Sequence, residues 1–183
     1  MPDPAAEWRQ LYEGRVFKLA QRRSTLADGK THTWDVVVHP GSVVVLAMPD
    51  DDHVCLIRNH RWVIGQTLYE LPAGTLDPGE DPDDCARREL HEETGYVGGR
   101  WRRLLEFYSA PGFLTERMHL YLAEEVTAGP AKLEPYENIT TEVVPWSRAM
   151  QMVADRAIID AKTLVGLMLF DGIRFGRLAL TEH

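Results

Sequence analysis

The sequence has few cysteines, no long apolar run and no excess of positive charge. Its two cysteines, Cys55 and Cys85, lie far apart without metal-ligand spacing, so we expect no cysteine metal site and predict buried or half-buried thiols in a reducing cytoplasm. The net charge of −8 argues against a general nucleic-acid-binding surface. The longest apolar runs are far too short to span a bilayer: Val36–Val38, Val43–Met48 and Leu164–Phe170.

Targeting signals and repeats are also missing. The first residues, MPDPAAEW, contain no basic stretch followed by an apolar one, so we expect no secretion signal. None of the seven histidines has paired spacing such as HExxH, so none is assigned to a metal. The chain has 183 residues, 44% of them apolar, and no low-complexity tract or linker. This predicts one domain, or one domain with a small appendage.

The pattern of apolar residues and turn signals predicts strands with helices on either side, that is, an α/β sandwich with mixed sheets. A hairpin with its turn at Asp28-Gly29 is expected near the N-terminus. The expected strands are Arg15–Gln21, Thr33–His39, Val43–Met48, Val54–Asn59, Leu68–Leu71, Arg103–Tyr108, Arg117–Ala123 and Thr141–Trp146. Two helices are expected after them, Ser147–Ala154 and Asp160–Phe170, with Ser147 and Asp160 as N-caps.

Three glutamates carry most of the functional information. Glu89, Glu92 and Glu93 stand at i, i+3 and i+4, which places them on one face of a helix, where like charges repel. A cation relieves this repulsion, and carboxylates select hard cations such as Mg²⁺. Because Mg²⁺ keeps several waters when few protein oxygens bind it, it is suited to bridging the phosphates of a substrate. The pattern therefore indicates a metal-dependent phosphate enzyme, which carries its positive charge as bound metal.

Local signals place these glutamates on a helix. Asp81 can cap its start, Pro82 is allowed in the first turn, and Gly95 supplies the C-terminal stop. Arg88 can neutralise part of the carboxylate charge. The competing interpretation is that a run such as RRELHEE is only a solvated helix face with ion pairs.

The spacing of the whole segment decides between these interpretations, because it resembles the Nudix box. Its pattern is matched in order: Gly74 is followed after five residues by Glu80, and Glu80 is followed after seven residues by the run Arg88-Glu89-Leu90-x-Glu92-Glu93-x-Gly95-Tyr96. The family usually has an aliphatic residue at the position of Tyr96, which should pack rather than react. The resemblance covers roughly Arg15 to Phe170 and implies the αβα sandwich of the family, with the box forming a loop, a helix and a loop.

Further segments resemble the ADP-ribose pyrophosphatase branch of the Nudix hydrolases. They are Arg58-Asn59-His60-Arg61, Glu70-Leu71-Pro72-Ala73-Gly74, Ser109-Ala110-Pro111-Gly112-Phe113-x-x-Glu116 and Glu137-Asn138-Ile139. Related enzymes often have Gln-Tyr or Gln-Phe where this chain has Asn59-His60. Enzymes that cleave other nucleoside diphosphate sugars share much of the same loop, so the sugar stays open.

The resemblance implies a role for each matching position of the box. The backbone carbonyl of Ala73 and the carboxylates of Glu89 and Glu93 match metal ligands, for Mg²⁺ or Mn²⁺ as a substitute. Glu92 assists one metal or its water. Arg88 orients the catalytic carboxylate, and the structural residues of the box are Gly74, Glu80 and Gly95. A glutamate of a later loop acts as general base in such enzymes; Glu137 is the candidate here, with Glu134 and Glu142 as alternatives.

Substrate contacts follow from the same resemblance. Arg61 has the planar fork that grips a phosphate, although a surface ion pair is its alternative role. Glu70 and Glu116 are candidates for ribose hydroxyls or for support of the neighbouring loop, and Pro111 and Gly112 for the substrate loop.

These comparisons imply hydrolysis of ADP-ribose to AMP and ribose 5-phosphate by Mg²⁺-activated water. The alternatives are a pyrophosphatase for a UDP- or GDP-hexose and a non-hydrolytic sensor of ADP-ribose. A homodimer is expected, with residues 1–40 as an N-terminal strand region in the dimer contact and residues 41–183 as the Nudix hydrolase domain. No nucleic-acid or membrane partner is expected.

Overall fold

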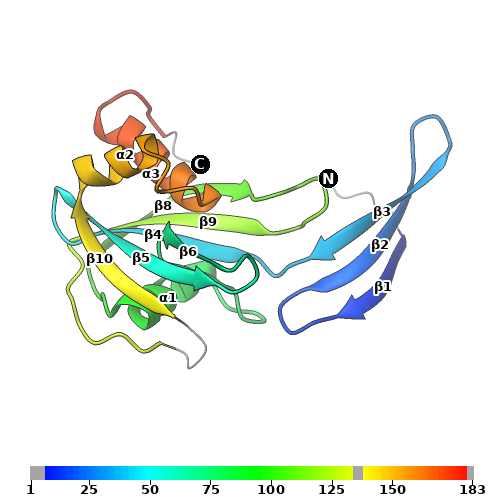
Figure 1. Ribbon diagram of the computed structural model, residues 1–183. Helices are drawn as coiled ribbons and strands as arrows, with labels where there is room; N and C mark the ends of the chain where they lie inside the picture. Colours follow the sequence, from blue (N-terminus) through cyan, green and yellow to red (C-terminus); the bar gives the residue numbers. More distant parts are fainter. Residues whose placement is uncertain (1–6, 134–137, 181–183) are drawn as a thin grey trace.

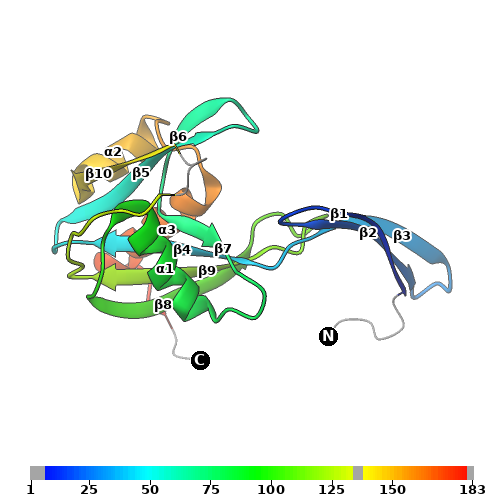
Figure 2. The ribbon, with the colours of Figure 1, turned by 90° about the horizontal axis from the view of Figure 1, so that it is seen from below.

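The N-terminal strands form a sheet of their own. In the computed structural model, which describes residues 7–133 and 138–180, they build a 3-stranded antiparallel sheet in the order β1-β2-β3. Figures 1 and 2 show this sheet reaching away from the rest of the chain. Its strands are β1 (Glu7–Glu13), β2 (Lys18–Thr25) and β3 (Thr31–Val38).

The remaining strands form a 7-stranded mixed sheet with the path β10-β5-β4-β9-β8. Strand β6 pairs with β5, and the short β7 pairs with β4. The β4–β9 pair is parallel, and the other pairs are antiparallel. The strands are β4 (Ser42–Met48), β5 (His53–Arg61), β6 (Gln66–Glu70), β7 (Ala73–Thr75), β8 (Arg100–Tyr108), β9 (Arg117–Glu124) and β10 (Ile139–Pro145).

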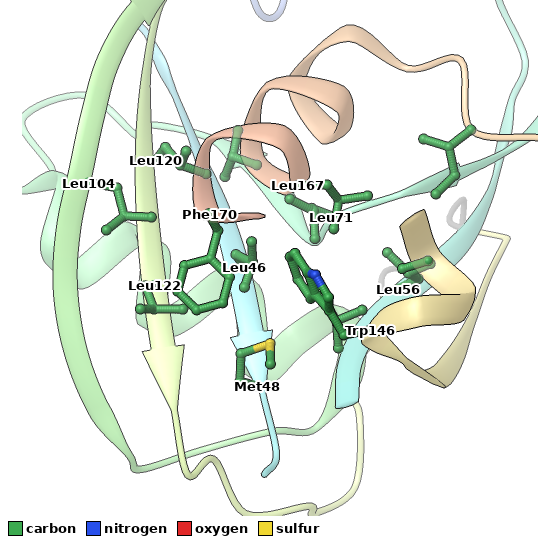
Figure 3. Packing of buried hydrophobic residues seen from close by; sticks show 14 of the residues in the cluster. Leu46, Met48, Leu56, Leu71, Leu104, Leu120, Leu122, Trp146, Leu167 and Phe170 are labelled. Atoms are coloured by element: carbon green, nitrogen blue, oxygen red, sulfur yellow. The ribbon is translucent and has the colours of Figure 1, made fainter. Parts of the chain in front are cut away.

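Strand β4 is buried along its whole length because both faces of the sheet are covered. Alternate side chains enter two separate clusters, as the period of a strand requires. Val44, Leu46 and Met48 pack with residues of the two later helices, α2 (Trp146–Ala154) and α3 (Ala161–Arg174) (Figure 3). Val43, Val45 and Ala47 pack instead with Cys85, Ala86 and Leu90 of α1 (Pro82–Thr94). The result is the αβα sandwich that the sequence predicts.

Helix α1 begins and ends where the sequence predicts. The Asp81 side chain accepts a hydrogen bond from the Asp83 amide at 2.8 Å, and Pro82 lies in the first turn. Gly95 ends the helix with φ +78°, and its amide donates to the His91 carbonyl at 2.8 Å. An added Cβ at Gly95 would also overlap the Gly129 carbonyl, so this position needs glycine for two reasons.

The caps of the other two helices give one confirmed and one wrong prediction. Asp160 caps α3, because its carboxylate accepts from the Thr163 amide at 3.0 Å and from the Thr163 hydroxyl at 2.7 Å. The helix continues to Arg174, beyond the predicted end at Phe170. For α2, the predicted cap Ser147 was wrong: the helix starts at Trp146 after Pro145, without a side-chain cap bond.

The predicted strands overlap strands of the structure, but several of their first and last residues differ. The Asp28-Gly29 turn is present, with Gly29 at φ +81°, but β2 and β3 run Lys18–Thr25 and Thr31–Val38. Strand β1 was not predicted as a distinct element, because all its side chains are exposed and no apolar alternation marks a buried face. Within the described residues, no helix is long and apolar enough to cross a membrane.

Strand β3 is also bonded to the loop between β8 and β9. The Val37 amide donates to the Phe113 carbonyl at 2.7 Å, and the Thr115 amide donates to the Val37 carbonyl at 3.0 Å. The His39 amide donates to the Thr115 hydroxyl at 2.9 Å. These bonds connect the N-terminal sheet to the loop that leads to Glu116.

Candidate active site

Helix α1 and strand β7 approach each other very closely at the predicted site. Glu93 is buried, and its Oε2 accepts a hydrogen bond from the Ala73 amide at 2.9 Å. The Glu89 carboxyl lies directly over Gly74, where an added Cβ would overlap its carboxyl carbon. Gly74 therefore leaves the space that the Glu89 carboxyl occupies, and the backbone of β7 lies against the carboxylates of α1.

Arg88 joins the remaining acidic residues of the segment. Its Nη1 donates to Glu89 Oε1 at 2.7 Å and to Glu92 Oε2 at 3.1 Å. Its Nε and Nη2 donate to the two carboxylate oxygens of Glu80, both at 2.8 Å. Hydrogen bonds from Arg88 lower the pKa of Glu80 from 4.5 to about 2, and Glu80 in turn raises the pKa of Arg88. Arg88 thus fixes Glu89 and Glu92, while Glu80 fixes Arg88.

A pocket of about 390 Å³ opens beside β7. Arg61 at its wall donates to the buried Glu70 through Nε at 2.7 Å and through Nη2 at 2.5 Å. Glu116, which also lines the pocket, accepts from the hydroxyls of Ser42 and Ser109, both at 2.6 Å. The lining residues are Ser42, Arg61, Ala73–Thr75, Phe107–Ser109, Glu116, Met118, Asp160–Lys162 and Val165.

Sequence comparison assigns this arrangement to a family. The chain matches the family described as NUDIX domain over residues 38–164, which include the carboxylates, Arg88 and all the pocket-lining residues except Val165. The chain belongs to the Nudix family. It is 38% identical over 156 residues to the ADP-ribose pyrophosphatase of Bacillus subtilis (strain 168), which covers 84% of both chains.

Other relatives are named for the same activity or for a different nucleotide sugar. The ADP-ribose pyrophosphatase of Mycobacterium tuberculosis is 31% identical over 91% of this chain and 82% of its own. The GDP-mannose pyrophosphatase of Klebsiella pneumoniae is 38% identical over 68% of this chain and 67% of its own. A crystal structure titled as an ADP compounds hydrolase superposes with a TM-score of 0.80 at 21% identity, covering 93% of each chain, and supports the same fold.

The donors expected to hold a metal are next to one another without forming a closed cluster. Among residues 7–133 and 138–180, no three His, Cys, Asp or Glu side chains are grouped so that they would hold an ion. Arg88 and the Ala73 amide engage these carboxylates instead. The donor set nevertheless fits a hard divalent cation, because the Glu93 carboxylate contacts the Ala73 amide, the Glu89 carboxyl lies over Gly74, and Ala73 and Gly74 both line the pocket.

The other predicted residues lie in different places. Glu137 and its alternative Glu134 are outside the described residues, and Glu142 is exposed on β10 opposite Leu56. Pro111 and Gly112 are exposed in the β8–β9 loop and are not among the residues that line the pocket.

Sequence reasoning gave no site role to Lys162, a charged residue that lines the pocket. Its Nζ donates to Glu70 Oε2 at 2.6 Å and forms an ion pair with Asp160 at 3.0 Å. The available signal was weak: a lysine two residues after the cap Asp160, in a helix whose next turns are apolar.

The Arg88–Glu80 pair leads to a prediction about acid stability. Folding lowers the Glu80 pKa from 4.5 to about 2, so the charged pair stabilises the fold fully above pH 4.5 and is lost as the pH falls toward 2. We expect Glu80→Gln to lower the free energy of unfolding by about 1–2 kcal/mol at pH 7, allowing for solvent screening. Urea unfolding of the native chain and of Glu80→Gln between pH 7 and pH 2 should show the difference in their free energies of unfolding becoming smaller below pH 4.5. An equal deficit at every pH would contradict the assignment, and Glu125→Gln serves as an exposed control.

Proposed function

We propose that this Nudix chain hydrolyses the pyrophosphate bond of ADP-ribose to AMP and ribose 5-phosphate, with water as the nucleophile. The observation that carries the proposal is the contact of the Glu89 and Glu93 carboxylates with the backbone of Ala73 and Gly74, at the wall of a pocket that also presents Arg61. Carboxylates for a cation and an arginine for phosphate are the groups that a diphosphate substrate needs.

In this proposal Mg²⁺, or Mn²⁺ as a substitute, is held by Glu89, Glu93 and the Ala73 carbonyl, and Glu92 assists. A bound divalent cation neutralises phosphate charge, lowers the pKa of a water and stabilises the leaving oxygen. The chain supplies the rest. Arg88 orients Glu89 and Glu92 through its Nη1, and a helix holds these ligands more rigidly than a loop would.

The proposed general base is Glu137, with Glu134 and Glu142 as alternatives. The proposal rests on the resemblance of Glu137-Asn138-Ile139 to the family segment, and on the turn residues Gly129 and Pro130 in the preceding polar stretch. Asn138 accepts a hydrogen bond from the His60 amide at 3.1 Å, so the chain returns beside β5, one residue before Arg61. Loss of the acidic limb of the pH–rate profile in only one of the three glutamine variants would identify the base, because a general base acts only when it is deprotonated.

Roles for the other substrate residues follow from their contacts. Arg61 is the proposed phosphate contact because it lines the pocket. Two hydrogen bonds to Glu70, from Nε and Nη2, hold its guanidinium in place. The Glu70 carboxylate already accepts hydrogen bonds from Arg61 and Lys162, so we propose that it positions these two side chains rather than binding a ribose. Glu116 remains the proposed contact for ribose hydroxyls, and Pro111 and Gly112 shape its loop.

A second candidate keeps the mechanism and changes the nucleotide sugar. The named GDP-mannose pyrophosphatases among the relatives favour it, since one is as similar in identity as the Bacillus subtilis enzyme. A sensor that binds without cleaving is less well supported, because every box carboxylate is present in this chain.

A substrate panel at fixed Mg²⁺ tests these proposals. ADP-ribose, UDP-glucose, GDP-mannose, NADH and diadenosine polyphosphates are compared by kcat/KM. We expect ADP-ribose to exceed the others by more than about tenfold, a margin within the range of pocket discrimination. A hexose substrate that wins by that margin would replace the first candidate with the second. Tight ADP-ribose binding without turnover of any compound would leave only the sensor.

We further propose a homodimer formed through residues 1–40, with residues 41–183 as the hydrolase domain. The support is the β1–β3 sheet, which extends from the body and exposes large apolar side chains: Trp8, Leu11, Tyr12, Val16 and Phe17. A three-stranded sheet needs a covered apolar face to be stable. Sedimentation equilibrium should give twice the chain mass of 20.8 kDa, and a single-chain mass at micromolar concentration would contradict the dimer.

The proposed location is a reducing cytoplasm. Cys55 and Cys85 are both buried and free, and burial raises the pKa of the Cys55 thiol to about 12. Such thiols need no oxidising compartment. Cell fractionation that recovered the protein outside the cytoplasm would contradict this assignment.

A further inference from the structure

The last turn of α1 carries two of the proposed metal ligands. Glu92 and Glu93 lie directly before Thr94, the final residue of the helix. Two glutamates are unfavourable there, because each repels Glu89 and lies at the negative end of the helix dipole. The last four carbonyls of a helix also lack partners within it, and helix ends fray. These ligands therefore lie in the part of α1 that most needs support from elsewhere in the chain.

That support comes from the chain between β9 and β10. The Lys132 amide donates a hydrogen bond to the Glu92 carbonyl at 2.8 Å, next to the bond of 2.8 Å that the His91 carbonyl accepts from the Gly95 amide. The first bond joins residues of two distant segments, whereas the second closes the helix locally. Lys132 thus caps the last turn of α1 from outside the helix, at the carbonyl of a proposed metal ligand.

The segment of residues 127–133, which contains Lys132, is held to the end of α1 through its backbone. All its residues are exposed, so side-chain packing contributes little to its position. Thr127 and Val97 exchange two backbone hydrogen bonds, of 2.8 and 2.9 Å, just beyond the helix. The Gly129 carbonyl then lies so close to Gly95 that an added Cβ would overlap it. The segment therefore passes the end of α1 at backbone contact distance (Figures 1 and 2).

We propose that the 127–133 segment positions Glu92 and Glu93 for metal binding, with Lys132 as a positioning residue that acts through its backbone amide. The inference rests on the proposed function and deepens it, because it assigns part of the geometry of the metal site to a segment outside the box. The competing role of the segment is only to lead the chain from β9 to β10. In that role it takes its place from α1 and has no effect on the helix.

Two pairs of variants separate these roles. Lys132→Pro removes the amide proton and with it the bond to the Glu92 carbonyl, whereas the matched control Lys132→Ala removes the side chain and keeps the amide. Gly129→Val acts independently: its Cβ would lie 3.0 Å from the Gly95 carbonyl oxygen, so the larger side chain forces the segment away from the helix. Its control is Ala128→Val, which enlarges the exposed neighbouring residue.

Amide hydrogen exchange of the metal-free chain reports on the helix end directly. We expect the Glu93 and Thr94 amides to exchange about tenfold faster in Lys132→Pro than in its alanine control, because the last turn opens more often. Exchange of the Cys85 amide, in the first turn, should be the same in both. Affinity for Mn²⁺ alone, followed by electron paramagnetic resonance, should fall about threefold to tenfold in Lys132→Pro and Gly129→Val relative to their controls. A loss of that size corresponds to about one backbone hydrogen bond.

Three results would overturn the inference. They are equal exchange in Lys132→Pro and Lys132→Ala, faster exchange with unchanged Mn²⁺ affinity, and a native chain that binds no Mn²⁺. A chain whose Mn²⁺ affinity falls as expected in the variants, but whose native form hydrolyses no nucleotide sugar, would refute the proposed function alone. Thermal unfolding midpoints accompany the titrations, and if Lys132→Pro does not fold, the comparison of Gly129→Val with Ala128→Val decides by the same criteria.

Discussion

Replacing Glu93 by glutamine is expected to lower kcat by about a hundredfold to a thousandfold, since a proposed metal ligand contributes several kcal/mol to the transition state. The substitution removes the negative charge and keeps the shape. The glutamine carbonyl oxygen can still accept the hydrogen bond that Glu93 Oε2 receives from the Ala73 amide at 2.9 Å. The fold should therefore survive, and steady-state kinetics with ADP-ribose at fixed Mg²⁺ measures the loss.

A second measurement links this loss to metal. The affinity for Mn²⁺, followed by electron paramagnetic resonance, should fall in Glu93→Gln in parallel with kcat. The matched control is Glu124→Gln, because Glu124 is a glutamate of β9 that pairs with Arg100 and does not line the pocket beside β7. Full activity of Glu93→Gln, or equal losses in both variants, would remove Glu93 from the proposed metal site.

Gly74→Ala is the second substitution with a large expected effect, and it acts through steric overlap rather than through a change of charge. A Cβ at position 74 would overlap the carboxyl group of Glu89, which is the far end of a flexible side chain and can move away. The unfolding temperature should therefore change little. Displacing a reacting group by about 1 Å costs on the order of a hundredfold in rate, so we expect a kcat/KM loss of that size.

A double-mutant cycle shows whether the effect passes through Glu89. In a Glu89→Ala background the obstructed carboxyl is absent, so Gly74→Ala should cost almost nothing more. Losses that add in full in the double variant would mean that Gly74 acts on another group, and the proposed ligand geometry would need revision.

The sequence predicted those features that depend on nearby residues. Caps such as Asp81 and Asp160 use hydrogen bonds within one turn, and both are confirmed. The burial of β4 follows from an unbroken apolar run, and the face of α1 that bears the glutamates follows from their spacing. The cap prediction at Ser147 was wrong because the chain enters α2 directly from Pro145, with no turn in which a serine could cap.

The features that the sequence did not predict depend on distant residues. Lys162 and Glu70 are 92 positions apart, and nothing local to either residue indicates that the fold buries them together. Glu70 directly precedes Leu71-Pro72 and was expected to reach substrate or support a loop, whereas in the structure it is fully buried between two cations. Such pairs are set by tertiary packing, which short-range patterns do not report.

The bonds between β3 and the β8–β9 loop bear on what counts as a folding unit in this chain. A division after residue 40 separates Val37 and His39 from Phe113 and Thr115, whose backbone and hydroxyl groups they satisfy. Removal of the first 40 residues would leave these groups of Phe113 and Thr115 without partners, one to three residues from Glu116 in the wall of the pocket. The N-terminal sheet is therefore not a separable unit, because its last strand holds part of the β8–β9 loop in place.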